Sequence, residues 1–227
     1  MPSRLRPTAP CAADAILVGD PGRALLLAQE LLEKPKMSNH ARGLWGYSGL
    51  TPAGDELTIQ STGIGGPSAA LVLADLAELG VRRAVRVGSC LATAGGVVRV
   101  GDLVLVEEAL AAGGSASAFG IAVGDSVLPD PALTGGLRTA LGDDARPATV
   151  ASFDAGPAAD ALLAAGVGAA DMQTVAILAR AAALGVAAAA VLIAVDSLDG
   201  AQLGEDLRED AEKRAGRVVS AVLSTSS

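Results

Sequence analysis

The sequence predicts an α/β protein, a three-layer α/β/α sandwich around a mixed, mostly parallel central sheet. Short apolar runs that suit buried strands alternate along the chain with segments of helical periodicity. The strand segments are almost continuously apolar, as is typical of strands covered on both faces. No linker, repeat or charge block divides the 227 residues, so we expect one domain over residues 1–227, with residues 1–14 flexible.

The first half of the chain opens with a strand, a turn and a helix. Residues 15–20, AILVGD, are an apolar run that ends in a turn, and residues 22–32 have helical spacing. Residues 41–50 and 55–63 alternate as two strands of a hairpin, joined by the turn-rich TPAGD. The further elements expected here are a helix from Pro67 to Leu79, ended by Gly80, and strands at 82–90 and 102–110.

The second half repeats the alternation of strands and helices. A loop rich in Gly, Ser and Ala covers residues 113–124. After it we expect helices at 131–142, 159–166, 174–185 and 205–224, the last amphipathic, and strands at 146–153, 169–173 and 186–197. In such a sheet, functional residues gather in the loops at the carboxyl ends of the strands.

Composition and charge exclude several functional classes. The chain has 17 Lys and Arg against 25 Asp and Glu, whereas nucleic acids and anionic membranes bind contiguous basic surfaces. Cys11 and Cys90 make no disulfide framework and no metal-ligand spacing, so we expect no metal. The amino-terminal segment lacks an apolar signal region, and the apolar stretch 181–195 is too short to cross a bilayer. We therefore expect a cytoplasmic protein with no membrane or nucleic-acid partner.

Three segments at strand ends are candidate binding sites. In GDPGR, residues 19–23, a capped helix start and Arg23 could hold an anion, although a plain strand-to-helix turn has the same pattern. In RVGSC, residues 86–90, an arginine sits inside an apolar strand, either as a ligand clamp or with its stem along the sheet. STGIGGPS, residues 61–68, lets a ligand approach the backbone but lacks a dinucleotide or P-loop spacing.

Together, GDPGR, STGIGGPS and RVGSC, in this order and at this spacing, resemble the nucleoside phosphorylase family that includes hexameric purine nucleoside phosphorylase and uridine phosphorylase. The resemblance runs from Ala15 to Ser197. It implies the α/β/α fold and active sites shared between the subunits of a homo-oligomer, a dimer or a trimer of dimers.

The resemblance also implies a phosphate site. By position, Gly19, Arg23, Arg86 and Ser89 match the residues that bind phosphate, and Arg42 matches an arginine lent to the neighbouring subunit. Three arginines would concentrate positive potential in an otherwise acidic protein. Inorganic phosphate is then a co-substrate, and no cofactor is expected.

For the nucleoside, the resemblance implies contacts from two further segments. Asp171, Met172 and Gln173 fall where the family has a Glu-Met-Glu motif around the ribose, although without the resemblance Met172 would more commonly fill the core. Cys90 and Phe153 are expected beside the base, Phe153 in the segment 152–157 that resembles the family's base-binding loop.

Asp196 matches the acid that protonates the leaving base in the purine enzymes, and Arg208 matches the arginine that assists it. A carboxyl at the mouth of an apolar strand is desolvated, which favours its protonated form; the alternative role of Asp196 is a helix or turn cap at the strand end. The implied reaction is dissociative: phosphate stabilises a ribosyl cation and captures its anomeric carbon as the base leaves.

Some positions depart from the family pattern. Gln173 offers one acceptor oxygen where the family has a carboxylate, Leu91 would intrude on the base pocket, and the only histidine, His40, is not at the amino terminus. A purine-type nucleoside phosphorylase is the favoured function. A uridine phosphorylase-like enzyme, a nucleoside hydrolase of the same fold and a non-catalytic nucleoside- or phosphate-binding protein remain open.

Overall fold

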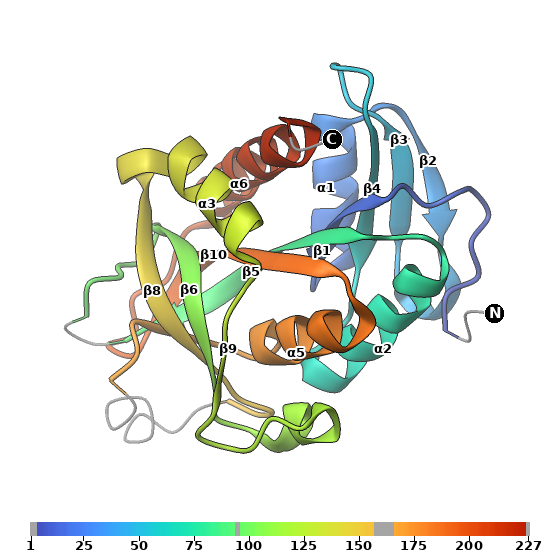
Figure 1. Ribbon diagram of the computed structural model, residues 1–227. Helices are drawn as coiled ribbons and strands as arrows, with labels where there is room; N and C mark the ends of the chain where they lie inside the picture. Colours follow the sequence, from blue (N-terminus) through green and yellow to red (C-terminus); the bar gives the residue numbers. More distant parts are fainter. Residues whose placement is uncertain (1–3, 94–95, 157–165, 226–227) are drawn as a thin grey trace.

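A computed structural model describes residues 4–93, 96–156 and 166–225. Its centre is a sheet of 10 strands, with helices α1, α3 and α6 on one face and α2 and α5 on the other (Figure 1). The predicted α/β/α layers and mixed sheet are confirmed.

The helices and strands alternate as the sequence predicts. The helices are α1 (Pro21–Leu31), α2 (Gly65–Glu78), α3 (Pro131–Leu141), α5 (Thr174–Leu184) and α6 (Glu205–Thr225). The strands are β1 (Asp14–Val18), β2 (Glu33–Asn39), β3 (Gly46–Leu50), β4 (Glu56–Ser61), β5 (Arg83–Ala92), β6 (Leu103–Ala111), β7 (Ser126–Val127), β8 (Ala145–Ser152), β9 (Ala169–Asp171) and β10 (Ala187–Ser197).

The sheet is parallel at its centre and partly closed on one side. β1 lies between β4 and β5, and β5 continues to β10, all in parallel. β6 pairs antiparallel with β10 and parallel with β8, and β9 then joins β8 back to β5. β5, β10, β6, β8 and β9 therefore form a closed ring, which the sequence did not predict because closure depends on pairing between distant strands.

Each face of the sheet carries its own apolar core. Leu192 of β10 packs into the core beneath α2 and α5, whereas its neighbour Ile193 packs into the core beneath α1, α3 and α6. Because successive side chains of a strand point to opposite faces, one apolar strand supplies both cores. This explains why the strand segments read as continuously apolar.

The structure differs from the prediction at a few segments. β2 is an additional edge strand whose side chains are mostly exposed, so it carries no apolar signal. The strand expected from residue 41 starts at Gly46, because Ala41–Gly43 form a short 3-10 helix. Another 3-10 helix, Gly114–Phe119, occupies the expected loop. The helix expected at 159–166 lies almost wholly outside the described residues.

Among the residues that the structure describes, no helix is both long enough and apolar enough to cross a membrane.

Candidate functional site

A cleft of about 820 Å³ opens where β1, β5, β9 and β10 end. The three predicted strand-end segments meet there. The cleft is lined by Gly19, Asp20, Pro21, Arg23, Gly63, Ile64, Gly65, Arg86, Ser89, Cys90, Leu91, Ala170, Asp171, Met172, Gln173, Val195, Asp196 and Arg208. It thus brings together all the predicted site residues except Arg42 and Phe153.

The turn after β1 starts helix α1 at the edge of the cleft. Asp20 is the N-cap residue, and its Oδ1 accepts a hydrogen bond from the backbone N–H of Arg23 at 2.8 Å. Pro21 follows in the first turn, where its missing N–H costs no hydrogen bond. The carboxylate of Asp20 therefore occupies part of the helix terminus that the sequence suggested for an anion.

Arg23 points from α1 toward the end of β5, and its side chain is only 3% exposed. Its Nη2 donates to Ser89 Oγ at 2.7 Å and lies 2.6 Å from Glu212 Oε1. Burial lowers the pKa of Arg23, and the negative charge of Glu212 opposes that shift. This predicted phosphate ligand is thus already paired with a carboxylate.

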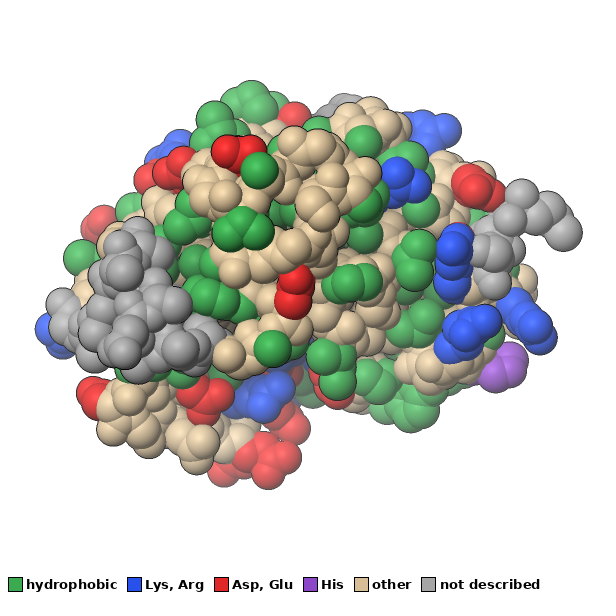
Figure 2. Space-filling view, turned by 90° about the horizontal axis from the view of Figure 1, so that it is seen from below, with side chains coloured by type: hydrophobic (Ala, Val, Ile, Leu, Met, Phe, Trp, Pro, Cys, Tyr) green, Lys and Arg blue, Asp and Glu red, His purple; other side chains and the backbone are tan. Residues whose placement is uncertain are grey.

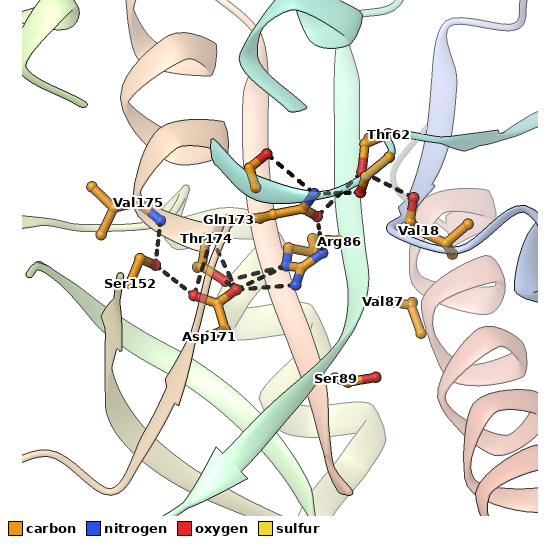
Figure 3. Close-up of polar contacts among 12 residues, drawn as sticks. Val18, Thr62, Arg86, Val87, Ser89, Ser152, Asp171, Gln173, Thr174 and Val175 are labelled. Atoms are coloured by element: carbon orange, nitrogen blue, oxygen red, sulfur yellow. Dashed lines mark hydrogen bonds and ion pairs between the residues drawn. The ribbon is translucent and has the colours of Figure 1, made fainter. Parts of the chain in front are cut away.

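Arg86 lies in β5 and is paired in the same way. Its Nη2 donates to Asp171 Oδ2 at 3.0 Å, and its Nη1 donates to Gln173 Oε1 at 2.7 Å (Figure 3). The side chain folds back over Gly88, where an added Cβ would lie 2.4 Å from the Arg86 Cζ atom. Only glycine at this position leaves room for this side-chain conformation. The buried ion pair with Asp171 compensates the charge of Arg86 inside an apolar strand.

Asp171 joins several elements at the floor of the cleft. Its carboxylate accepts hydrogen bonds from Ser152 Oγ of β8 at 2.5 Å and from Thr174 Oγ1 at 2.6 Å (Figure 3). It also accepts from the backbone N–H of Thr174 at 3.0 Å, at the start of α5. With its side chain 1% exposed, Asp171 holds β5, β8, β9 and α5 together.

Gln173 uses both ends of its amide inside the protein. Besides accepting from Arg86, its Oε1 accepts from Thr62 Oγ1 at 3.2 Å. Its Nε2 donates to the backbone oxygens of Gly63 at 2.7 Å and Gly65 at 3.3 Å. Gln173 therefore links the glycine-rich loop to Arg86 of β5. The family resemblance, which placed Gln173 at the ribose, did not suggest this role.

Asp196 and Arg208 both line the cleft. Asp196 is half-buried near the end of β10, just after a register shift against β5. Arg208 reaches the cleft from α6, where its Nε donates to Glu212 Oε1 at 2.9 Å. The two predicted catalytic residues thus share one cavity, and the hydrogen bond of Arg208 goes to Glu212.

The apolar wall of the cleft includes Cys90, Leu91 and Met172. Burial raises the pKa of the Cys90 thiol, and the nearby charge of Asp171 raises it further. Leu91 lines the cleft, as expected from its position. Phe153 packs in the same small apolar cluster as Leu91 but does not line the cleft.

Arg42 lies apart from the cleft in the 3-10 helix before β3. It is exposed, like His40, and its backbone has a positive φ of 60°. In the view from below, Lys and Arg side chains gather at the same end of the molecule as the histidine (Figure 2). The contribution of Arg42 to the phosphate site of a neighbouring subunit stays a prediction.

Sequence reasoning missed the residues that pair with the predicted ones. Ser152 and Thr174 carry no motif, because their roles arise from contacts across the sheet. The contact of Glu212 with Arg208 could have been predicted from the spacing, because the two residues are four positions apart on an amphipathic helix. Over the described parts of the chain, no group of three or more His, Cys, Asp or Glu side chains could hold a metal ion.

The model of the phosphorylase superfamily matches residues 14–225. The chain belongs to the phosphorylase superfamily. The superfamily resemblance predicted from GDPGR, STGIGGPS and RVGSC is thereby confirmed.

Curated relatives in the superfamily are similar over part of their length. The DeoD-type purine nucleoside phosphorylase of Oceanobacillus iheyensis is 40% identical over 99 residues, which are 43% of this chain and 41% of the relative. The enzyme of the same name from Clostridium perfringens is 41% identical over 98 residues, 41% of this chain and 40% of the relative. The matched region thus spans about two fifths of these relatives.

Solved structures of the superfamily share the fold over nearly the whole chain. Uridine phosphorylase from Vibrio fischeri, complexed with 6-hydroxy-1-naphthoic acid, aligns with a TM-score of 0.80 and 22% identity, covering 95% of this chain and 92% of that one. Purine nucleoside phosphorylase from Toxoplasma gondii, in complex with immucillin-H, aligns with a TM-score of 0.82 and 20% identity, covering 93% and 90%.

Proposed function

We propose that the protein is a nucleoside phosphorylase that cleaves the N-glycosidic bond of a purine-type nucleoside with inorganic phosphate. The observation that carries this proposal is the single cleft, which gathers Arg23, Arg86 and Ser89 with Asp196 and the β9–α5 segment. The curated relatives named purine nucleoside phosphorylase support the purine class over the uridine class. The products are the free base and ribose 1-phosphate.

In the proposed reaction, positive charge develops on the ribose as the base departs. A phosphate dianion held near Arg23, Arg86 and Ser89 stabilises that charge and then bonds to the anomeric carbon. Asp196, which lines the cleft, donates a proton to the base, which leaves neutral instead of as an anion. Met172 packs against the sugar and Cys90 lies beside the base.

The proposal includes the setting of the enzyme. We assign it to the cytoplasm and to nucleotide salvage, as a homo-oligomer in which Arg42 serves the phosphate site of a neighbouring subunit. Its exposure leaves Arg42 available for such a contact. Phosphate is the co-substrate, and the reaction uses no cofactor.

Base release by the purified protein tests the proposal. Inosine, adenosine, guanosine and uridine are incubated with and without phosphate, with wild type, Asp196→Asn and Asp199→Asn compared. Asp199 is exposed, three residues away and outside the cleft, so it is a matched control. We expect phosphate-dependent release from a purine nucleoside, lowered about 100-fold or more by Asp196→Asn only. Silence across the panel would instead indicate a non-catalytic binding protein.

A nucleoside hydrolase of the same fold is the second candidate. It is favoured by one observation, that Arg23 and Arg86 are each paired with a buried carboxylate and so attract phosphate less than free arginines would. Equal base release in both buffers would support hydrolysis by water, and release only with phosphate would exclude it.

A further inference from the structure

Arg23 is already engaged by groups inside the protein. A guanidinium carries five N–H donors; the Nη2 of Arg23 donates to Ser89 Oγ and lies 2.6 Å from Glu212 Oε1. Its Nη1 donates to the backbone oxygen of Val87 at 3.3 Å, while its Nε is buried without a hydrogen-bond partner. The strongest of these contacts is the ion pair with Glu212.

Glu212 contacts Arg23 but is not among the residues that line the cleft. It lies on α6 and lines a groove between α1 and α6, together with Arg23 and Arg208, which also line the cleft. Its side chain is 6% exposed, and a single oxygen, Oε1, faces both arginines, at 2.6 Å from Arg23 and 2.9 Å from Arg208. The carboxylate is thus a fixed, poorly screened charge beside the predicted phosphate site.

Glu212 changes the balance between arginines and carboxylates around the cleft. Three arginines reach the cleft, and three carboxylates line it directly: Arg23, Arg86 and Arg208, and Asp20, Asp171 and Asp196. Glu212 adds a fourth carboxylate within hydrogen-bond distance of two of these arginines. Even when Asp196 holds the proton that it donates, Asp20, Asp171 and Glu212 equal the three arginines in number, so the site has no excess positive charge for a dianion.

We propose that Glu212 sets the affinity of the anion site: it neutralises Arg23 and thereby weakens the binding of inorganic phosphate. This inference rests on the proposed function, because it takes Arg23 to be the phosphate ligand. Glu212 touches neither phosphate nor nucleoside in this scheme, and it acts on phosphate binding through Arg23. Its removal leaves Arg23 with a charge that a bound phosphate can compensate.

Calorimetric titration of the full-length protein with inorganic phosphate tests the inference. Glu212→Gln keeps the shape of the side chain and an acceptor oxygen for Arg23 while removing the charge. We expect it to bind phosphate about tenfold more tightly than wild type, the change expected for one charge-assisted hydrogen bond. Glu209→Gln is the matched control, since Glu209 is exposed on the same helix and pairs with Lys213.

Two further measurements separate this role from a purely structural one. Thermal unfolding of each variant with increasing phosphate measures the stabilisation by the ion relative to the same variant without it, so a general loss of stability cancels. Glu212→Asp, with a shorter carboxylate, should shift phosphate affinity in the same direction by a smaller factor. In the enzyme assay, Glu212→Gln should lower the KM for phosphate by a larger factor than it changes the KM for nucleoside.

Unchanged or weaker phosphate binding by Glu212→Gln, relative to Glu209→Gln, would overturn the inference, as would the absence of phosphate binding in all variants. Failure of the proposed function looks different. In that case no nucleoside is cleaved in a phosphate-dependent way, while the phosphate affinities of the variants still rank as the inference requires.

Discussion

At the scale of single residues, the cleft is built from polar side chains that satisfy one another before any ligand binds. Gln173 shows this most directly, because its amide oxygen and nitrogen bond to Arg86, Thr62, Gly63 and Gly65. A buried amide that loses such partners costs more than an exposed one. The side chain that the sequence placed on the ribose is therefore first a link between the glycine-rich loop and β5.

Gln173→Ala tests this link. It removes the partner of Arg86 Nη1 and the donor to Gly63, so we expect the free energy of unfolding to fall by about 2 kcal/mol. Chemical denaturation measures the change, with Gln29→Ala, at an exposed position of α1, as the control. Full stability of Gln173→Ala combined with lost nucleoside binding would contradict a linking role and support direct contact with the sugar.

At the scale of elements, helices α2 and α5 approach each other closely beneath the sheet. Their contact is possible because Gly66 lies at the start of α2, where an added Cβ would sit 2.9 Å from the Cβ of Ala176 on α5. It would also lie 2.5 Å from Ser115 Oγ, in the 3-10 helix before β7. The glycines of STGIGGPS thus serve helix packing as well as the cleft.

Gly66→Ala is expected to destabilise the protein by about 1–3 kcal/mol, because the Cβ of Ala176 has no rotamer through which to move away. Gly135→Ala on α3 is the matched control. Nothing lies within 4 Å of the added Cβ there, so alanine should raise the stability by about 0.5–1 kcal/mol. Equal melting temperatures for the two variants would contradict this view of the α2–α5 contact.

At the scale of the whole molecule, β10 connects the two apolar cores and the closed part of the sheet. It pairs with β5 on one side and with β6 on the other. Leu192 and Ile193 are both fully buried, one in each core. Because Asp196 lies one residue before the end of this strand, the stability of the fold and the position of the proposed acid depend on the same element.

Ile193→Ala should therefore lower the free energy of unfolding by about 2–5 kcal/mol, through lost burial and the cavity left behind. Leu207→Ala on α6 is the control, since Leu207 is 63% exposed, and a change within about 0.5 kcal/mol is expected there. Both variants are measured by reversible denaturation. A small effect of Ile193→Ala would show that the core around β10 can collapse to fill the space.

Much of the architecture can be predicted from short-range patterns in the sequence. The order of strands and helices follows from hydrophobic periodicity, and residues such as Asp20 and Pro21 mark a helix start by short-range hydrogen bonding and geometry. The segments of the cleft were also predictable, since carboxyl ends of neighbouring parallel strands meet at one edge of a sheet. The edge strand β2 was not, because exposed polar side chains give no periodic signal.

The sequence by itself determined the superfamily, the layers and which segments meet in the cleft. Only the tertiary structure decided which carboxylates pair with the arginines of the cleft. Arg23 and Glu212 are far apart in the chain, and their ion pair exists because α1 and α6 pack side by side. Closure of the ring through β9 likewise depends on distant pairing. Local sequence patterns specify helices and strands, whereas ion pairs between these elements depend on how the elements pack. The carboxylate partner of each arginine was therefore known only from the tertiary structure.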